Sequence, residues 1–182
     1  FELQPSFDVL QRRASVAVLQ GEPKSAVPVL RRWLEEKRGE EASVREMLAE
    51  LWMRDGNWKA AREEYEKLVA EGRAGANVLN NLANVLLVQG EGDPVRLAEQ
   101  ALALETGNVG IADTLGWALA QAGRFDEAMR HLRDARLRAP EDPEIRWHLG
   151  YVLAKLGRAQ EARAELQFAL KASPAASWAG EA

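Results

Sequence analysis

The 182-residue sequence contains no cysteine and only two histidines, His131 and His148. Without thiols the chain has no disulfide framework, no cysteine nucleophile and no cysteine-based zinc site. Two histidines that lie far apart in the sequence are a poor basis for a metal site built from protein ligands. We therefore expect no metal and no cofactor.

The sequence also lacks an excess of positive charge and long apolar runs. It carries 24 basic and 28 acidic residues, which gives a formal net charge of −4. Nucleic-acid binding requires a concentrated positive surface, so we expect no nucleic-acid partner. No stretch approaches the roughly 18 uninterrupted apolar residues of a membrane-spanning helix, and the first residues lack a signal-peptide pattern. We therefore predict no membrane-spanning segment in this chain.

Residues that favour β-strands are scarce. The chain has 31 alanines and 24 leucines against 13 valines, two isoleucines and two threonines. Alanine and leucine favour helices, whereas β-branched residues favour strands. This composition predicts an all-α fold.

The same residue types recur at an offset of 34 positions in the second half of the chain. The matching pairs are Leu115-Gly116 with Leu149-Gly150, Leu119 with Leu153, Gly123 with Gly157, Ala128 with Ala162, Leu132 with Leu166, Ala135 with Ala169, and Pro140 with Pro174. Small residues at the eighth and twentieth places and a proline near the end make the unit resemble the tetratricopeptide repeat (TPR), a helix–turn–helix motif.

In this frame the chain divides into five repeats flanked by two tails. The repeats are 7–41, 42–75, 76–108, 109–142 and 143–176, with residues 1–6 as the tail of a preceding repeat and 177–182 as a C-terminal tail. Neither helix of a repeat can bury its apolar stripe alone, so neighbouring repeats must stack. The resemblance implies a right-handed superhelical α-solenoid whose concave face is lined by the first helix of each repeat.

Several local features of the repeats carry predictions of their own. The small residue at the eighth place should let the two helices of each repeat approach closely. In the five repeats, in order, this residue is Ala14, Ala49, Ala83, Gly116 and Gly150. Turn glycines should end the first helices in the left-handed conformation, at Gly21, Gly56, Gly123 and Gly157. In the irregular turn of the third repeat, we predict Asp93 as the N-cap and Pro94 as the first helical residue. Pro28 should cause a kink or a late start of the second helix.

Both ends of the chain lack an evident capping element. Because residues 1–6 resemble the end of a repeat, we expect the native protein to be longer and the first repeat here to be uncapped. The C-terminal tail is short and supplies no polar capping helix. These ends could bury apolar surface against another molecule, and we therefore expect self-association through them.

The candidate binding site is the concave face, where first-helix residues point away from the second helices. Its proposed ligand-binding residues are Asn77, Asn80, Asn84, Asp113, Trp117, Gln121, Trp147, Tyr151 and Lys155. Amide side chains can donate to and accept from an extended chain, and aromatic side chains are common interface anchors. An alternative stays open: the asparagines stabilise local turns, and Trp117 and Tyr151 pack in the core.

The other tryptophans and histidine receive structural roles. We expect Trp33, Trp52 and Trp58 to pack between helices, and Trp178 to lie in a frayed tail. We expect His148 to be a structural histidine; the alternative is a pH-sensitive residue of the groove. The basic stretch from Arg130 to Arg138, interleaved with acidic residues, is typical of an ordinary solvated helix with pairs three and four residues apart; the alternative is a basic docking patch.

Catalysis and carboxylate recognition are not favoured. Some TPR proteins hold a partner's C-terminal carboxylate with lysine, arginine and asparagine, but this groove offers only Arg54 and Lys155 as cations. Asp113 and Glu144 could face one groove as an acid and a base, yet an open, hydrated groove would not separate their pKa values. We therefore predict a non-enzymatic scaffold that binds a partner protein or peptide.

A closer resemblance involves three segments: Asn80-Asn81-Leu82-Ala83, Ala112 to Trp117, and Pro143 to Leu149. They resemble the C-terminal repeats of bacterial TPR lipoproteins from exopolysaccharide and exosortase (PEP-CTERM) systems. This resemblance implies a periplasmic or envelope location. It also supplies the alternative function, a polysaccharide-binding or assembly scaffold in exopolysaccharide export or envelope biogenesis.

Overall fold

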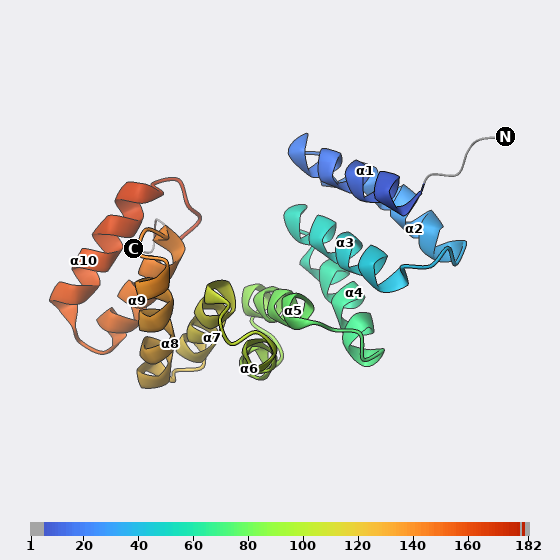
Figure 1. Ribbon diagram of the computed structural model, residues 1–182. Coiled ribbons are helices and arrows are strands. Elements are labelled where there is room, and N and C mark those ends of the chain that lie inside the picture. Colours follow the sequence, from blue (N-terminus) through green and yellow to red (C-terminus); the bar gives the residue numbers. More distant parts are fainter. Residues whose placement is uncertain (1–5, 179, 181–182) are drawn as a thin grey trace. The chain divides into compact units, whose positions relative to one another are not determined.

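The computed structural model describes residues 6–178 and residue 180. These residues form ten α-helices and one 3₁₀-helix, with no strand among them (Figure 1). The all-α prediction is confirmed. None of the helices in the described part of the chain is both long and apolar enough to cross a membrane.

The chain forms two compact units, Phe1–Gly90 and Glu91–Ala182, and each is described by itself. The division falls in the irregular turn that the sequence marks inside the third predicted repeat. The helices of the first unit are α1 Phe7–Leu19, η1 Pro23–Ala26, α2 Val27–Glu35, α3 Glu41–Arg54, α4 Trp58–Ala70 and α5 Ala76–Gln89. Those of the second unit are α6 Pro94–Leu104, α7 Val109–Gln121, α8 Phe125–Arg138, α9 Pro143–Lys155 and α10 Ala159–Ala172.

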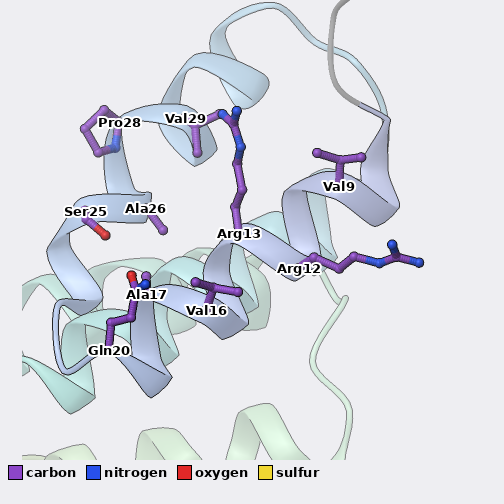
Figure 2. A pocket seen from close by; sticks show the side chains of 10 residues that line it. All are labelled: Val9, Arg12, Arg13, Val16, Ala17, Gln20, Ser25, Ala26, Pro28 and Val29. Atoms are coloured by element: carbon purple, nitrogen blue, oxygen red, sulfur yellow. The ribbon is translucent and has the colours of Figure 1, made fainter.

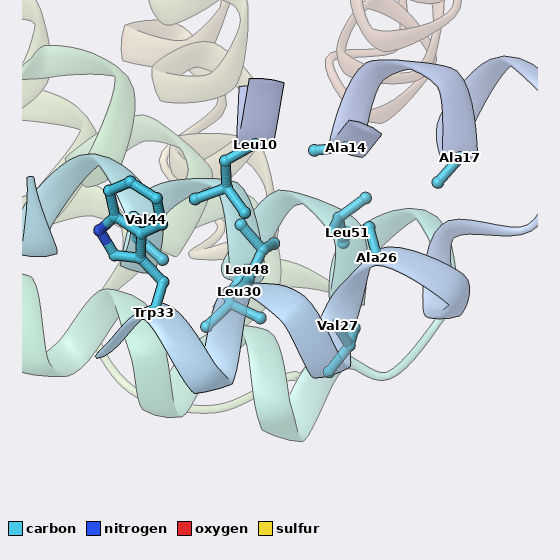
Figure 3. Close-up of a cluster of buried hydrophobic side chains, with 10 residues drawn as sticks. All are labelled: Leu10, Ala14, Ala17, Ala26, Val27, Leu30, Trp33, Val44, Leu48 and Leu51. Carbon is cyan, nitrogen blue, oxygen red and sulfur yellow. The ribbon is translucent and has the colours of Figure 1, made fainter. Parts of the chain in front are cut away.

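The core of the first unit forms where α1, α2 and α3 meet. Figure 3 shows Leu10 of α1, Leu30 of α2 and Leu48 of α3 converging, with the Trp33 ring beside them. Trp33 is 5% exposed, and its indole N–H donates to the backbone oxygen of Gly39 at 2.8 Å. The apolar ring is thus buried while its polar atom is satisfied. The predicted packing role of Trp33 is confirmed.

Two proline predictions are confirmed by helix starts. The segment Pro23–Ala26 forms a 3₁₀ turn, and α2 begins only at Val27, so Pro28 lies in its first turn, where a missing N–H costs nothing. In the second unit, α6 begins at Pro94. The Asp93 side chain caps it by accepting from the backbone N–H of Arg96 at 3.1 Å.

Glycines have two different roles, as predicted. The turn glycines Gly21, Gly56, Gly123 and Gly157 have φ between 73° and 75°, the left-handed region that ends a helix. Within helices, glycine permits close packing. A Cβ on Gly116 would lie 2.5 Å from Cγ of Leu132, and one on Gly150 would lie 2.7 Å from Cγ of Leu166. The first and second helices of these repeats therefore approach as closely as the small residues predict.

The basic stretch on α8 forms ion pairs. Arg130 lies 3.9 Å from Glu127, and Arg138 lies 3.3 Å from Asp134, at the predicted spacings of three and four residues. Both pairs are largely exposed, so each contributes little to stability. The prediction of an ordinary solvated helix is confirmed for these pairs.

Candidate functional site

A candidate site lies on α7 and α9, the first helices of the two C-terminal repeats. Residues three or four apart share one face of a helix. We call the surface formed here the α7–α9 face; it comprises Asp113, Trp117 and Gln121 of α7 and Glu144, Tyr151 and Lys155 of α9. Trp147 and His148 lie directly behind it. Side-chain contacts join five of the six candidate residues predicted in the second unit: Trp117, Trp147, Tyr151, Lys155 and, through His148, Asp113. Gln121 is placed near them only by its position on α7.

Trp117 is the centre of an aromatic cluster. Its ring lies 4.5 Å from the imidazole of His148 at an interplanar angle of 17°, which is a stacked arrangement. The ring centroid also lies 4.8 Å from that of Trp147, and 5.2 Å from that of Tyr151 in an edge-on arrangement. Trp117 and Tyr151 nevertheless remain partly exposed. Trp117 and Tyr151 thus pack against neighbouring rings, as the core-packing interpretation expects. They also keep exposed surface that a ligand could contact, as the binding interpretation requires.

Trp147 and Trp178 require corrections to the sequence-based prediction. Trp147 was expected to face the groove, but it is only 7% exposed. Trp178 was expected in a frayed tail, yet its ring stacks on that of Trp147 with a centroid distance of 5.4 Å and an angle of 13°. The segment after α10 returns to cover an apolar ring that would otherwise contact water. The sequence signal was one large aromatic residue in a tail of small residues.

Asp113 and His148 form a buried pair between α7 and α9. The side chains are in hydrogen-bond contact, with the His148 Nδ1 atom 2.9 and 3.0 Å from the two carboxylate oxygens of Asp113. The residues are 9% and 4% exposed. The prediction of a structural His148 is confirmed. Asp113 was predicted as a ligand-binding residue, but the structure engages its carboxylate inside the protein because α9 places a buried donor opposite it.

The polar rim of the face consists of Gln121, Glu144 and Lys155, all exposed. Although the Glu144 side chain is exposed overall, its carboxyl group is partly desolvated, and this burial raises its pKa. His148 lowers that pKa, whereas Asp113 and Asp142 raise it further. The Lys155 Nζ atom lies 5.1 Å from the Tyr151 ring centroid, within the range of a cation–π contact.

The three asparagine candidates lie on α5 in the first unit. Asn77 is exposed, whereas Asn80 and Asn84 are partly buried. The buried Oδ1 atom of Asn80 has no hydrogen-bond partner among the described residues. The asparagine set and the aromatic set thus belong to different units, and the contacts of the aromatic set join α7 to α9.

Sequence reasoning missed Asn81, the asparagine of α5 that does join two helices. Its side-chain amide donates to the Tyr65 hydroxyl at 3.1 Å, and that hydroxyl donates to the sulfur of Met53 at 3.4 Å. Burial of Tyr65 raises its pKa, with opposing stabilisation of the phenolate by Asn81. Asn81 follows Asn77 by four residues, a spacing that places both on one face. This spacing was the sequence signal that Asn81 could have a role on that face. It did not show which asparagine amide would donate to the Tyr65 hydroxyl.

An open cleft on the first unit was not predicted. It has a volume of about 650 Å³ and lies between α1 and the η1–α2 segment (Figure 2). Figure 2 shows Arg13 extending from α1 toward Val29, while Val9 and Arg12 lie at its outer rim. Val9 is 40% exposed and Val16 is 47% exposed, so α1 presents apolar side chains to solvent. Self-association through such exposed side chains stays a prediction.

Among the described residues no group of three or more histidine, aspartate or glutamate side chains could hold a metal ion. The site offers partly exposed aromatic rings and polar groups at its rim. Such an arrangement suits binding by contact and hydrogen bonding.

Comparison with solved structures shows the same fold in several proteins. YrrB, described as a TPR protein with an unusual peptide-binding site, aligns with a TM-score of 0.72 and 17% identity over 98% of this chain and 91% of that chain. MamA from Desulfovibrio magneticus RS-1 aligns with a TM-score of 0.77 and 13% identity over 93% and 96% of the two chains. TTC0263, a thermophilic TPR protein of Thermus thermophilus, aligns with a TM-score of 0.70 and 21% identity over 93% of each chain.

Comparison of sequences identifies the family. No curated protein sequence matches the chain. A family model described as tetratricopeptide repeat matches residues 11–77, 47–93 and 114–177, which together span more than half of the sequence. The resemblance to exopolysaccharide-system lipoproteins is not shown by these matches. The chain belongs to the tetratricopeptide repeat family.

Proposed function

We propose that the chain is a non-enzymatic scaffold that binds an extended segment of a partner protein on the α7–α9 face. The observation that carries this proposal is the placement of Trp117 and Tyr151. Both rings are held by aromatic neighbours, and both stay partly exposed. A ring already fixed by its neighbours loses little conformational freedom on binding, so its contacts add to affinity at small entropic cost.

The rim supplies the hydrogen bonds that such a segment needs. Gln121 offers both a donor and an acceptor to a peptide backbone, and Lys155 offers a donor. Tetratricopeptide repeats present their first helices as a continuous binding surface. The fold likeness to YrrB, whose description names a peptide-binding site, supports the same assignment for this chain.

The alternative ligand is a polysaccharide, since aromatic faces can stack on sugar rings. Two contacts weigh against it here. One face of Trp117 stacks on His148, and one face of Trp147 stacks on Trp178. Each stack occupies one ring face and so reduces the flat area on which a sugar ring could lie, whereas a peptide side chain can also contact the ring edges. These contacts favour the peptide.

The test should leave the aromatic cluster intact, because Trp117→Ala would also remove packing contacts. A photoreactive residue in place of Gln121 would report binding on the α7–α9 face. The matched control is the same residue in place of Arg130 on α8, whose side chain is 73% exposed. The probe is a pool of random 12-residue peptides, selected on the wild-type protein by display and then synthesised with a fluorescent label.

We expect the selected peptides to cross-link at position 121 and not at position 130. Unlabelled peptide should compete with this cross-link. Equal cross-linking at both positions, or selection of no peptide, would overturn the proposal. The polysaccharide alternative would be favoured by two results together. Neutral oligosaccharides would quench the tryptophan fluorescence, and unlabelled peptide would fail to compete with the cross-link.

A further inference from the structure

Glu144 is an unpaired carboxylate at one end of the α7–α9 face. Its backbone N–H donates to the N-cap Asp142, but among the described residues its side chain has no hydrogen-bond or ion-pair partner. Residues three and four positions further along α9 are Trp147 and His148, and both contact Trp117. Glu144 therefore stands one helical turn from the aromatic cluster, and its side chain is exposed.

The basic side chains nearest to Glu144 in sequence are engaged on other surfaces. Arg146 pairs with Glu165 of α10 at 3.0 Å, and its guanidinium lies 3.5 Å from the centroid of the Phe168 ring. Arg138 pairs with Asp134 of α8 at 3.3 Å, and Arg136 reaches Glu165 at 3.4 Å. All three arginines are thus engaged with acids other than Glu144. No ion pair within the described part of the chain compensates the charge of Glu144.

The groups that face Glu144 add negative charge. Asp113 and Asp142 both raise its pKa, and only His148 acts in the opposite direction. Lys155 lies 11 residues along the same helix, which corresponds to about 16 Å of rise. This separation exceeds the screening length of about 8 Å at physiological ionic strength. The face thus has a negative end at Glu144, an aromatic middle at Trp117 and Tyr151, and a positive end at Lys155.

We propose that the partner segment bound at this face contributes a lysine or arginine whose alkyl stem lies on the exposed part of Trp117 and whose cation pairs with Glu144. This inference rests on the proposed peptide-binding function. Charge complementarity selects the occupant: an acidic side chain would add like charge beside Glu144 and Asp113, and a neutral one would leave Glu144 uncompensated. Lysine and arginine combine an apolar stem with a charged head, which matches an aromatic ring next to a carboxylate.

The experiment is a double-mutant cycle between the protein and its selected peptides. Peptides that cross-link at position 121 are sequenced, and each basic residue in them is changed singly to glutamine. Affinities are then measured for the wild-type chain, for Glu144→Gln, and for the control Glu141→Gln. Glu141 is an exposed acid in the turn just before α9, so its substitution removes the same charge outside the face.

For wild-type protein, we expect substitution of one basic peptide residue to weaken binding by about three- to tenfold, which lies between the effect of an exposed ion pair and that of a hydrogen bond to a buried charged group. Glu144→Gln should reduce that effect to less than about twofold, whereas Glu141→Gln should leave it unchanged. Peptides that bind at the face without a basic residue, or without coupling to Glu144, would overturn this inference and leave the proposed function intact. Selection of no peptide at this face would overturn both.

Discussion

The Nδ1 atom of His148 lies 2.9 and 3.0 Å from the two carboxylate oxygens of Asp113, and both residues are buried. A carboxylate only accepts hydrogen bonds, so we assign the ring proton to Nδ1, which donates it. The pair connects α7 to α9, and the imidazole also stacks on Trp117. The orientation of the exposed aromatic ring thus depends on a buried polar contact between two repeats.

The first prediction concerns this pair. Asp113→Ala leaves the Nδ1–H group of His148 buried without a partner, and we expect a loss of about 1–3 kcal/mol in the free energy of unfolding. Asp113→Asn retains an acceptor and should cost less. Urea unfolding measures both values. Equal stability of Asp113→Ala and the wild type would show that the pair does not stabilise the fold.

The second prediction concerns close packing at Gly116. A Cβ there would lie 2.5 Å from Cγ of the fully buried Leu132, so Gly116→Ala should destabilise the chain by about 1–3 kcal/mol through overpacking. The control is Gly110→Ala in the same helix, where the nearest atom would be 3.5 Å away. That variant should be neutral or slightly more stable, because alanine favours helix. If both variants behaved alike, the close approach of α7 and α8 would be in doubt.

The third prediction concerns the C-terminal cover of Trp147. Trp178→Ala removes the ring stacked on Trp147, so the emission maximum of the protein should shift to longer wavelength as water reaches that indole. We expect a cost of about 1 kcal/mol, the range for an aromatic pair. Substitution of the neighbouring Ser177 by alanine is the control. An unchanged emission spectrum in Trp178→Ala, after correction for the lost fluorophore, would contradict the stacked arrangement.

The fourth prediction is a pH dependence at Glu46 in the first unit. Burial raises the pKa of Glu46 above its ordinary value, so the folded state binds a proton more readily than the unfolded state. Ionised Glu46 therefore opposes folding above the raised pKa, and this cost disappears as the pH falls through it. Glu46→Gln should melt at a higher temperature than the wild type at about pH 7, and the difference should vanish by about pH 4.

Thermal unfolding followed by circular dichroism at several pH values would measure this difference. The matched control is Glu63→Gln, because Glu63 is exposed on α4. It should show no comparable pH-dependent gain. A Glu46→Gln variant that is less stable than the wild type near neutral pH would contradict the assignment of burial as the dominant cause.

Local features of the sequence determined the class of fold. Gly116 and Gly150 recur at the repeat period because each repeat needs a small residue where its two helices approach. Each repeat shows this requirement within its own sequence. Likewise, Asp93 before Pro94 specifies a helix start through hydrogen bonding and a fixed φ, both of which act within one turn. Such signals depend on neighbours in the chain, so they can be interpreted without tertiary structure.

The sequence by itself also placed Asp113, Trp117, Trp147 and Tyr151 in one region, because helical spacing and the repeat offset put them on adjacent first helices. Only the tertiary structure decided which of them keep side-chain surface exposed. Trp147 is covered because a tail residue, Trp178, returns to stack on it, and Asp113 is engaged because α9 brings a buried imidazole opposite its carboxylate. Burial and pairing depend on residues distant in the chain, and helical periodicity carries no information about them.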